Sequence, residues 1–215
     1  MGLILRGALL LACLGLPLAW GSSLPEEDPF DFPVGTRWSY VGTSGGQKTS
    51  VVQEVIAVRQ GEFFAPGEGG TLYPLRMRTR CGEAGDEFES DSMRPYLALS
   101  GGFLITGNLG GNAVRLYKVS SRKGQSWPCI APRKSSDPEA EFIHLGIEKV
   151  TVPAGDFPNA RHIRMRAGPE AAGHATDFWI VPGLGIVKTR AVSLLAGSPR
   201  EVVLELDSFQ RARKP

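Results

Sequence analysis

Several features are scarce in this 215-residue sequence, and each scarcity argues against a class of function. Charge of one sign is not in excess, since 24 Lys and Arg face 22 Asp and Glu. Domains that bind nucleic acid usually carry a strong basic excess, so we expect no nucleic-acid partner. The same balance argues against a broad electrostatic attraction to a membrane surface. Cysteine occurs only three times, with no spacing that fits a zinc site.

Catalytic motifs are scarce as well. Serines lie in turns such as that of Ser44, where Gly42–Gly46 matches the letters Gly-x-Ser-x-Gly but stands between two expected strands rather than before the helix of a nucleophile elbow. The glycines of Gly107–Gly111 lack the lysine of a phosphate-binding loop. The acidic cluster Glu83–Asp91 is more typical of a solvated loop than of paired catalytic carboxylates. We therefore expect a protein that is not an enzyme and that has no cofactor.

The histidines are the remaining candidates for a metal site. His144, His162 and His174 fall on three successive expected strands. With turns near Asp156 and Ala171, His162 is displaced along the sheet by about six residues from the other two. That displacement is too large for a shared coordination sphere, so we expect separate histidines and no metal.

An export signal is the clearest feature that the sequence does have. Met1–Gly21 contains one positive charge, Arg6, then an apolar run, then small residues before Ser22. These are the parts of a secretory signal, and the run is shorter than the roughly 20 residues of a membrane span. Leu10–Cys13 also fits a lipoprotein signal, in which Cys13 would be acylated. Both alternatives predict export to the periplasm, cell envelope or medium, with membrane attachment only through the signal or a lipid.

The exported chain divides into three parts. Ser22–Phe32 is acidic, rich in proline and without periodicity, which is typical of a tether. A single domain follows from Pro33 to Gln210, and Arg211–Pro215 forms a basic tail. The domain contains Cys81 and Cys129, and an exported chain permits a disulfide between them. Such a bridge would contribute about 4 kcal/mol, and two free thiols are the alternative.

Period-two alternation dominates the domain. It is clearest in Leu75–Cys81, His162–Arg166 and Glu201–Asp207, where one face is apolar or small and the other is charged. Glycine pairs such as Gly45-Gly46 separate the alternating segments, and only Ser92–Leu99 favours a short helix. The pattern predicts an all-β antiparallel sandwich, barrel or strongly curved sheet. Further strands are expected at Arg37–Gly42, Thr49–Arg59, Phe103–Gly107, Val114–Ser120, Glu141–Val152, Thr176–Val181 and Ile186–Leu195.

Rows of like charge follow from the same alternation. Arg76, Arg78 and Arg80 share one strand face, and Arg164 and Arg166 share another. Such a stripe could meet an anionic polymer or lipid headgroup. The acidic row of Glu201–Asp207 could instead pair with arginines across strands, at about 0.2–1 kcal/mol per pair.

Three short motifs are spread over the domain: Pro33–Tyr40 (Pro-Val-Gly-Thr-Arg-Trp-Ser-Tyr), Val152–Phe157 (Val-Pro-Ala-Gly-Asp-Phe) and Phe178–Lys188 (Phe-Trp-Ile-Val-Pro-Gly-Leu-Gly-Ile-Val-Lys). Their order resembles that of the TapB-like bacterial envelope proteins, a group largely of unknown function. The resemblance implies an antiparallel meander curved into a half-barrel or open barrel, similar in outline to the Lol-type carriers of lipoprotein acyl chains. Those carriers close the concave face with helices, and this chain has little helix to offer.

Together these observations predict an exported, non-enzymatic envelope protein that binds a protein or a surface polymer through a curved sheet. The alternative is a carrier of a hydrophobic ligand or lipid on the concave face, and a hydrolase with an unrecognised site is the third possibility. The residues expected at the ligand or partner surface are Trp38, Tyr40, Phe103, Phe178, Trp179, Arg76, Arg78 and Arg80.

Overall fold

The computed structural model describes residues 30–62, 69–82, 88–99, 103–106, 114–118, 120–128, 140–167, 174–193 and 200–213. The predicted signal with Cys13, most of the predicted tether, and Cys129 lie outside these ranges. Every regular element in the described part is a β-strand. No helix there has the length and apolar character needed to cross a membrane.

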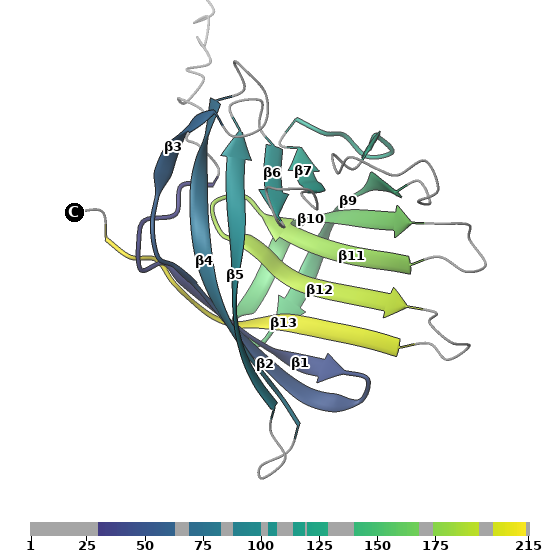
Figure 1. Ribbon diagram of the computed structural model, residues 1–215. Helices are drawn as coiled ribbons and strands as arrows, with labels where there is room; N and C mark the ends of the chain where they lie inside the picture. Colours follow the sequence, from purple (N-terminus) through teal and green to yellow (C-terminus); the bar gives the residue numbers. More distant parts are fainter. Residues whose placement is uncertain are drawn as a thin grey trace, which may run out of the picture.

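Within the described residues, one sheet contains thirteen strands, and every pairing in it is antiparallel (Figure 1). Their order across the sheet is β7-β6-β5-β4-β2-β1-β13-β12-β11-β10-β9-β8, with β3 paired to β4 outside this path. The bounds are β1 Arg37–Ser44, β2 Gln47–Val55, β3 Arg59–Glu62, β4 Gly69–Cys81, β5 Phe88–Leu99, β6 Phe103–Thr106, β7 Val114–Lys118, β8 Ser126–Pro128, β9 Ala140–Val152, β10 Gly155–Ala167, β11 His174–Val181, β12 Gly185–Ser193 and β13 Arg200–Gln210.

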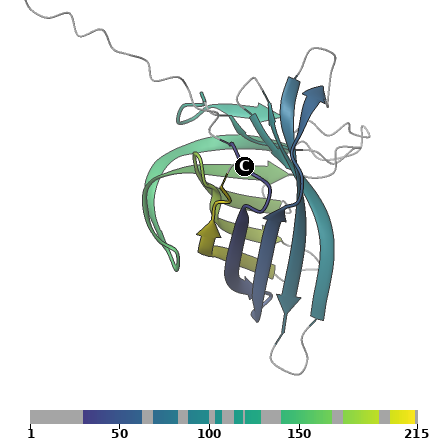
Figure 2. The ribbon, with the colours of Figure 1, turned by 90° about the vertical axis from the view of Figure 1, so that its left-hand side faces the viewer.

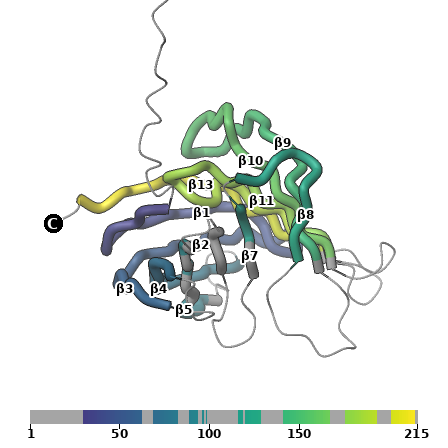
Figure 3. The backbone as a smooth tube through the Cα atoms, turned by 90° about the horizontal axis from the view of Figure 1, so that it is seen from above, coloured from purple at the N-terminus to yellow at the C-terminus, as the bar shows by residue number. Residues whose placement is uncertain are grey.

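The sheet is strongly curved and does not close on itself. Strands β7 and β8 end the order, and no pairing joins them in the described part of the chain. Figure 2 shows the long β9–β10 hairpin bending around one side, and Figure 3 shows the wrapped outline from above. The predicted all-β fold, an antiparallel half-barrel, is confirmed.

One local prediction is wrong. Ser92–Leu99, expected as a short helix, belongs to β5 and pairs with β4 along its length. Pro95 lies opposite Pro74 in this pair. Because neither proline has an N–H group, the ladder tolerates both at this one position.

The core begins earlier in the chain than the sequence suggested. Phe30 and Phe32, assigned above to the tether, are only 1% and 0% exposed. The ring of Phe32 lies 4.9 Å from that of Trp38 and 5.3 Å from that of Tyr73, both in edge-on geometry. This segment is therefore part of the domain, because large aromatic side chains contribute much of the apolar burial in a core of this size.

Two of the three sequence motifs meet in space, although 146 residues separate Trp38 from Leu184 and Tyr40 from Ile186. The indole N–H of Trp38 donates to the carbonyl of Leu184 at 2.6 Å, and the hydroxyl of Tyr40 donates to the carbonyl of Ile186 at 2.9 Å. Gly185 lies between these acceptors with φ of 97°, a conformation that favours glycine. The β11–β12 turn is thereby fixed against β1, and the motifs specify the fold.

Candidate functional site

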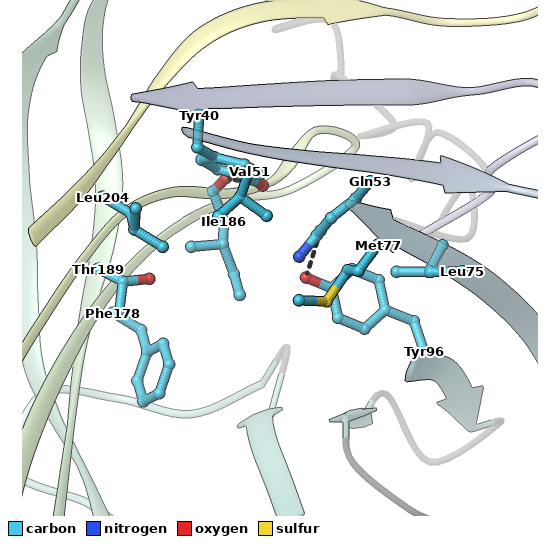
Figure 4. A pocket seen from close by; sticks show the side chains of 10 residues that line it. All are labelled: Tyr40, Val51, Gln53, Leu75, Met77, Tyr96, Phe178, Ile186, Thr189 and Leu204. Atoms are coloured by element: carbon cyan, nitrogen blue, oxygen red, sulfur yellow. Dashed lines mark hydrogen bonds between the residues drawn. The ribbon is translucent and has the colours of Figure 1, made fainter. Parts of the chain in front are cut away.

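A partly open cavity of about 180 Å³ lies on the concave face of the half-barrel (Figure 4). Most of its lining is aliphatic or aromatic. The lining side chains come from β1, β2, β4, β5, β11, β12 and β13, and they are Tyr40, Val51, Gln53, Leu75, Met77, Tyr96, Phe178, Ile186, Thr189 and Leu204.

Strand alternation explains how several of these residues reach the cavity. Gln53 on β2 is paired directly with Met77 on β4, and Phe178 on β11 is paired directly with Thr189 on β12. Directly opposed residues of an antiparallel pair point to the same face. Ile186 joins them because the register between β11 and β12 shifts at Ile180. A regular ladder would place residues 186 and 189 on opposite faces.

The cavity contains hydroxyl and amide groups but no Asp, Glu, Lys, Arg or His among its lining residues. The hydroxyl of Tyr96 donates to Oε1 of Gln53 at 3.4 Å. Burial, and secondarily the neighbouring Tyr96, raises the pKa of Tyr40 well above its ordinary value. Tyr40 is therefore neutral at physiological pH, and the lining contributes no formal charge.

The volume limits what the cavity can hold. An engineered apolar cavity of about 150 Å³ in another protein stays dry and binds benzene. Pockets for drug-sized ligands are usually about 300 Å³ or larger. The space here suits one ring or a short stretch of hydrocarbon chain, rather than a whole lipid.

The aromatic residues predicted for a ligand surface lie in different parts of the structure. Tyr40 and Phe178 line the cavity, as expected of a concave-face site. Trp38 does not: it is completely buried in the core, and its indole N–H donates to Leu184 in the β11–β12 turn. Trp179 also does not, because it projects from the face of β11 opposite to Phe178 and is bonded to Glu148. The side chain of Phe103 lies outside the described residues.

The predicted arginine row is present on the outer face of β4. Arg76, Arg78 and Arg80 are all exposed, and Arg80 lies 3.8 Å from Glu89 on β5. Among the described residues neither Arg76 nor Arg78 has an ion pair within 4 Å, although Glu54 on β2 lies directly opposite Arg76 and Asp91 on β5 directly opposite Arg78.

The acidic row of β13 does not neutralise these arginines. Glu205 pairs with Lys188 at 2.6 Å, and Glu201 pairs with Arg190 at 2.6 Å, both on β12. The acidic row therefore does pair across strands, but its partners are on β12 and not among the β4 arginines, because β2 and β1 separate β4 from β13.

A polar network that sequence reasoning did not find occupies the outer side of β9, β10 and β11. Asp177 accepts hydrogen bonds from His162 at 2.8 Å and from Nε and Nη2 of Arg164 at 2.7 and 3.1 Å. The ring of His162 stacks on Trp179 with centroids 4.5 Å apart, and Trp179 donates to Glu148. Only 9% of the Asp177 side chain is exposed.

The charges of this network are mutually stabilised. Burial alone would raise the pKa of Asp177, but the hydrogen bonds from His162 and Arg164, with the positive charge of Arg164, outweigh it. The pKa of Asp177 therefore lies below its ordinary value. A buried carboxylate with three donors is typical of a structural ion pair.

The predicted register of the histidines is wrong. His144 lies opposite Ile163, one residue away from His162, because the β9–β10 turn falls at Pro153 and a bulge follows at Gly146. Their ring nitrogens already have protein partners. Those of His144 face the carbonyls of Ser121 and Gly146, at 3.0 and 3.2 Å, whereas those of His162 face two carboxylates. The described residues hold no cluster suited to a metal ion.

The predicted disulfide has no support. Cys81 is a free, half-buried thiol at the end of β4. Its sulfur accepts from the hydroxyl of Thr49 at 3.3 Å and lies 3.6 Å from Oε1 of Gln47. Cys129 lies outside the described residues, and Pro128 before it belongs to β8, at the far end of the strand order from β4.

The comparisons with known proteins concern the fold. No family model and no curated protein matches the chain. A Bacteroides fragilis protein with a YmcC-like fold, thought to be exported, has TM-score 0.55 and 13% identity, with 85% of this chain and 98% of that one covered. A Parabacteroides distasonis protein thought to be a lipoprotein has TM-score 0.54 and 12% identity, with the same coverage. The TapB-like resemblance is not confirmed, and at these identities the likeness establishes the half-barrel fold alone.

Proposed function

We propose that this chain is an exported cell-envelope protein that binds an apolar group of a small ligand in the concave cavity, without catalysing a reaction. The observation that carries the proposal is the cavity itself: about 180 Å³, mostly apolar, and formed by seven strands of the half-barrel. This is the hydrophobic-carrier alternative of the sequence analysis, narrowed to a ligand group no larger than one ring or a short chain.

Export rests on two independent supports. The Met1–Gly21 segment has the composition of a secretory signal. The two proteins that share the fold are themselves thought to be exported or lipid-anchored. A ligand-binding role in the envelope is compatible with both the cleaved and the acylated form of the signal.

Energetics favour apolar occupancy of the cavity. Burying apolar surface contributes about 25 cal/mol per Å², and empty apolar space forfeits dispersion contacts with its walls. An apolar group that fills the cavity therefore buries its own surface and restores dispersion contacts with the walls, and both effects favour binding. The rigid β-strands around it reduce the ordering cost of binding.

Filling the cavity with protein tests the proposal. We expect isopropylbenzene to bind the purified domain, as measured by calorimetry, and Thr189→Phe to weaken binding at least about tenfold because its ring occupies the site. The matched control is Thr43→Phe, which adds the same ring on the exposed outer face of β1. Absence of binding to the wild-type domain, or equal binding by both variants, would contradict the proposal.

A second candidate function keeps the leading expectation from the sequence, which is binding of a protein or surface polymer. It rests on Arg76 and Arg78, which are exposed and without an ion pair among the described residues. In this case an acidic polysaccharide such as polygalacturonate would bind with a strong salt dependence. Replacing both arginines by Ala would abolish that binding, whereas Arg190→Ala, which removes an arginine already paired with Glu201, would leave it unchanged.

A further inference from the structure

We infer that the ligand of the concave cavity is uncharged and carries a hydrogen-bond acceptor, such as a carbonyl or hydroxyl oxygen, beside its apolar group. This inference rests on the proposed function and names the chemical class that the same site selects. Two polar side chains in an otherwise apolar lining carry it: Gln53 on β2 and Thr189 on β12.

Gln53 has hydrogen-bonding capacity to spare. Its Oε1 accepts from the hydroxyl of Tyr96, but its amide nitrogen has no hydrogen-bond partner among the described residues. A primary amide has two N–H donors. Because the side chain is only half-buried, water can reach these donors in the free protein, and a ligand that covers them without supplying an acceptor would leave them unpaired at a cost in free energy. A ligand oxygen placed in the cavity would satisfy at least one of them.

Thr189, on the cavity wall opposite Gln53, also has a polar group without a protein partner. Its hydroxyl forms no hydrogen bond with any described residue, and the side chain is half-buried in the cavity wall. Figure 4 shows the polar ends of Gln53 and Thr189 directed from opposite walls toward the space between them. Two unpaired polar groups that converge on one apolar space are the usual means by which a binding site orients its ligand.

Charge on the buried group is excluded by the rest of the lining. No lining residue is an acid, a base or a histidine, and Tyr40 stays neutral. An ionised carboxylate or ammonium moved into this space would lose its hydration without gaining a counterion, at a cost of several kcal/mol. A charged part of the ligand, if it has one, must therefore remain outside in water.

Three small probes of the same heavy-atom skeleton test this inference: isopropylbenzene, acetophenone and benzoate. They differ in whether the substituent is apolar, a neutral acceptor or an anion. The two variants are Gln53→Met and Thr189→Val, which keep side-chain size while removing the polar atoms. Affinities are measured by calorimetry on the folded domain, and the thermal midpoint of each variant is checked alongside.

We expect Gln53→Met to weaken acetophenone binding about fivefold, the equivalent of one ordinary hydrogen bond, and to leave isopropylbenzene binding equal or tighter. Thr189→Val should act in the same direction, and benzoate should not bind the wild type. If acetophenone and isopropylbenzene respond alike to both variants, or if benzoate binds as well as acetophenone, the inferred ligand class is wrong while the apolar site stands. If isopropylbenzene does not bind the wild type, the proposed function itself fails.

Discussion

Strands β11 and β12 carry two polar environments on their opposite faces, and the two differ in how their hydrogen bonds are satisfied. On the outer face, Asp177 has three donors and Lys188 is paired with Glu205. On the concave face, Thr189 has no hydrogen-bond partner among the described residues, and Gln53 across the cavity uses only part of its capacity. The same strands thus build a closed network on one side and an open site on the other.

The contrast separates structural polarity from functional polarity. A buried polar group with every partner in place rigidifies the fold, because breaking it exposes an unpaired charge in a poorly solvated place. A half-buried polar group without a protein partner is open to water in the free protein, so a ligand that displaces this water must supply the hydrogen-bond partner itself. We therefore expect mutations in the outer network to change stability and mutations in the cavity to change binding.

The largest expected effect is the loss of Asp177. Asp177→Ala should lower the free energy of unfolding by about 3 kcal/mol, since it leaves His162 and Arg164 without their shared acceptor. The value is at the low end for a broken buried pair because 40% of the Arg164 side chain is exposed. Chemical denaturation followed by circular dichroism measures the change.

Asp207→Ala is the matched control for this variant. Asp207 is an exposed carboxylate on β13, and its removal should change the unfolding free energy by less than about 0.5 kcal/mol. Equal losses of unfolding free energy in Asp177→Ala and Asp207→Ala would show that the outer network adds no stability beyond that of an exposed carboxylate. An unchanged isopropylbenzene affinity in folded Asp177→Ala would keep stability and binding separate.

The second prediction concerns the pH dependence of the same contrast. Because the folded-state pKa of Asp177 lies below its ordinary value of 3.8, its stabilisation is complete above about pH 3.8 and is lost as the pH falls through the folded-state value. The difference in unfolding free energy between wild type and Asp177→Ala should be fully present just above pH 4 and should shrink as the pH falls below about 4. A difference that grew below pH 4 would contradict this assignment.

His144 contributes at a separate pH. Burial lowers its pKa below the ordinary 6.5, so the folded state resists a proton that the unfolded chain accepts. Both wild type and Asp177→Ala should lose stability as the pH falls below about 6.5, and this loss cancels in their difference. A single pH titration of both proteins therefore separates the two effects: the His144 loss appears in each protein, and the Asp177 loss appears only in their difference.

Much of the fold could be predicted from alternation alone. Segments such as Leu75–Cys81 and Glu201–Asp207 showed their two faces directly in the sequence, and both are strands. Phe178, predicted for a ligand or partner surface, lines the cavity, since an aromatic residue on a half-buried strand tends to face the core. Alternation is a property of a single segment, so it can be recognised in the sequence without knowing which strands are its neighbours.

The site itself depends on information that periodicity does not contain. Trp179 was predicted beside Phe178, yet adjacent residues of a strand point to opposite faces. Ile186 reaches the cavity only through a register shift, and the bulge at Gly146 places His144 beside His162. Gln53 and Thr189 gave no sequence signal, because an unpaired polar group is recognisable only after its neighbours are known.

The smallest expected effect compares two buried tyrosines. The hydroxyl of Tyr40 donates to the carbonyl of Ile186, whereas the buried hydroxyl of Tyr117 has no hydrogen-bond partner among the described residues. Burial, partly opposed by the charge of Arg161, raises the pKa of Tyr117 to about 12, so the hydroxyl stays neutral. Tyr40→Phe should therefore cost about 1 kcal/mol, and Tyr117→Phe should cost nothing or stabilise the domain slightly. Both variants lose the same hydroxyl oxygen, so the difference between their thermal unfolding midpoints measures what the hydrogen bond to Ile186 contributes. Equal losses of stability would remove the distinction between satisfied and unsatisfied polar groups, on which the cavity assignment depends.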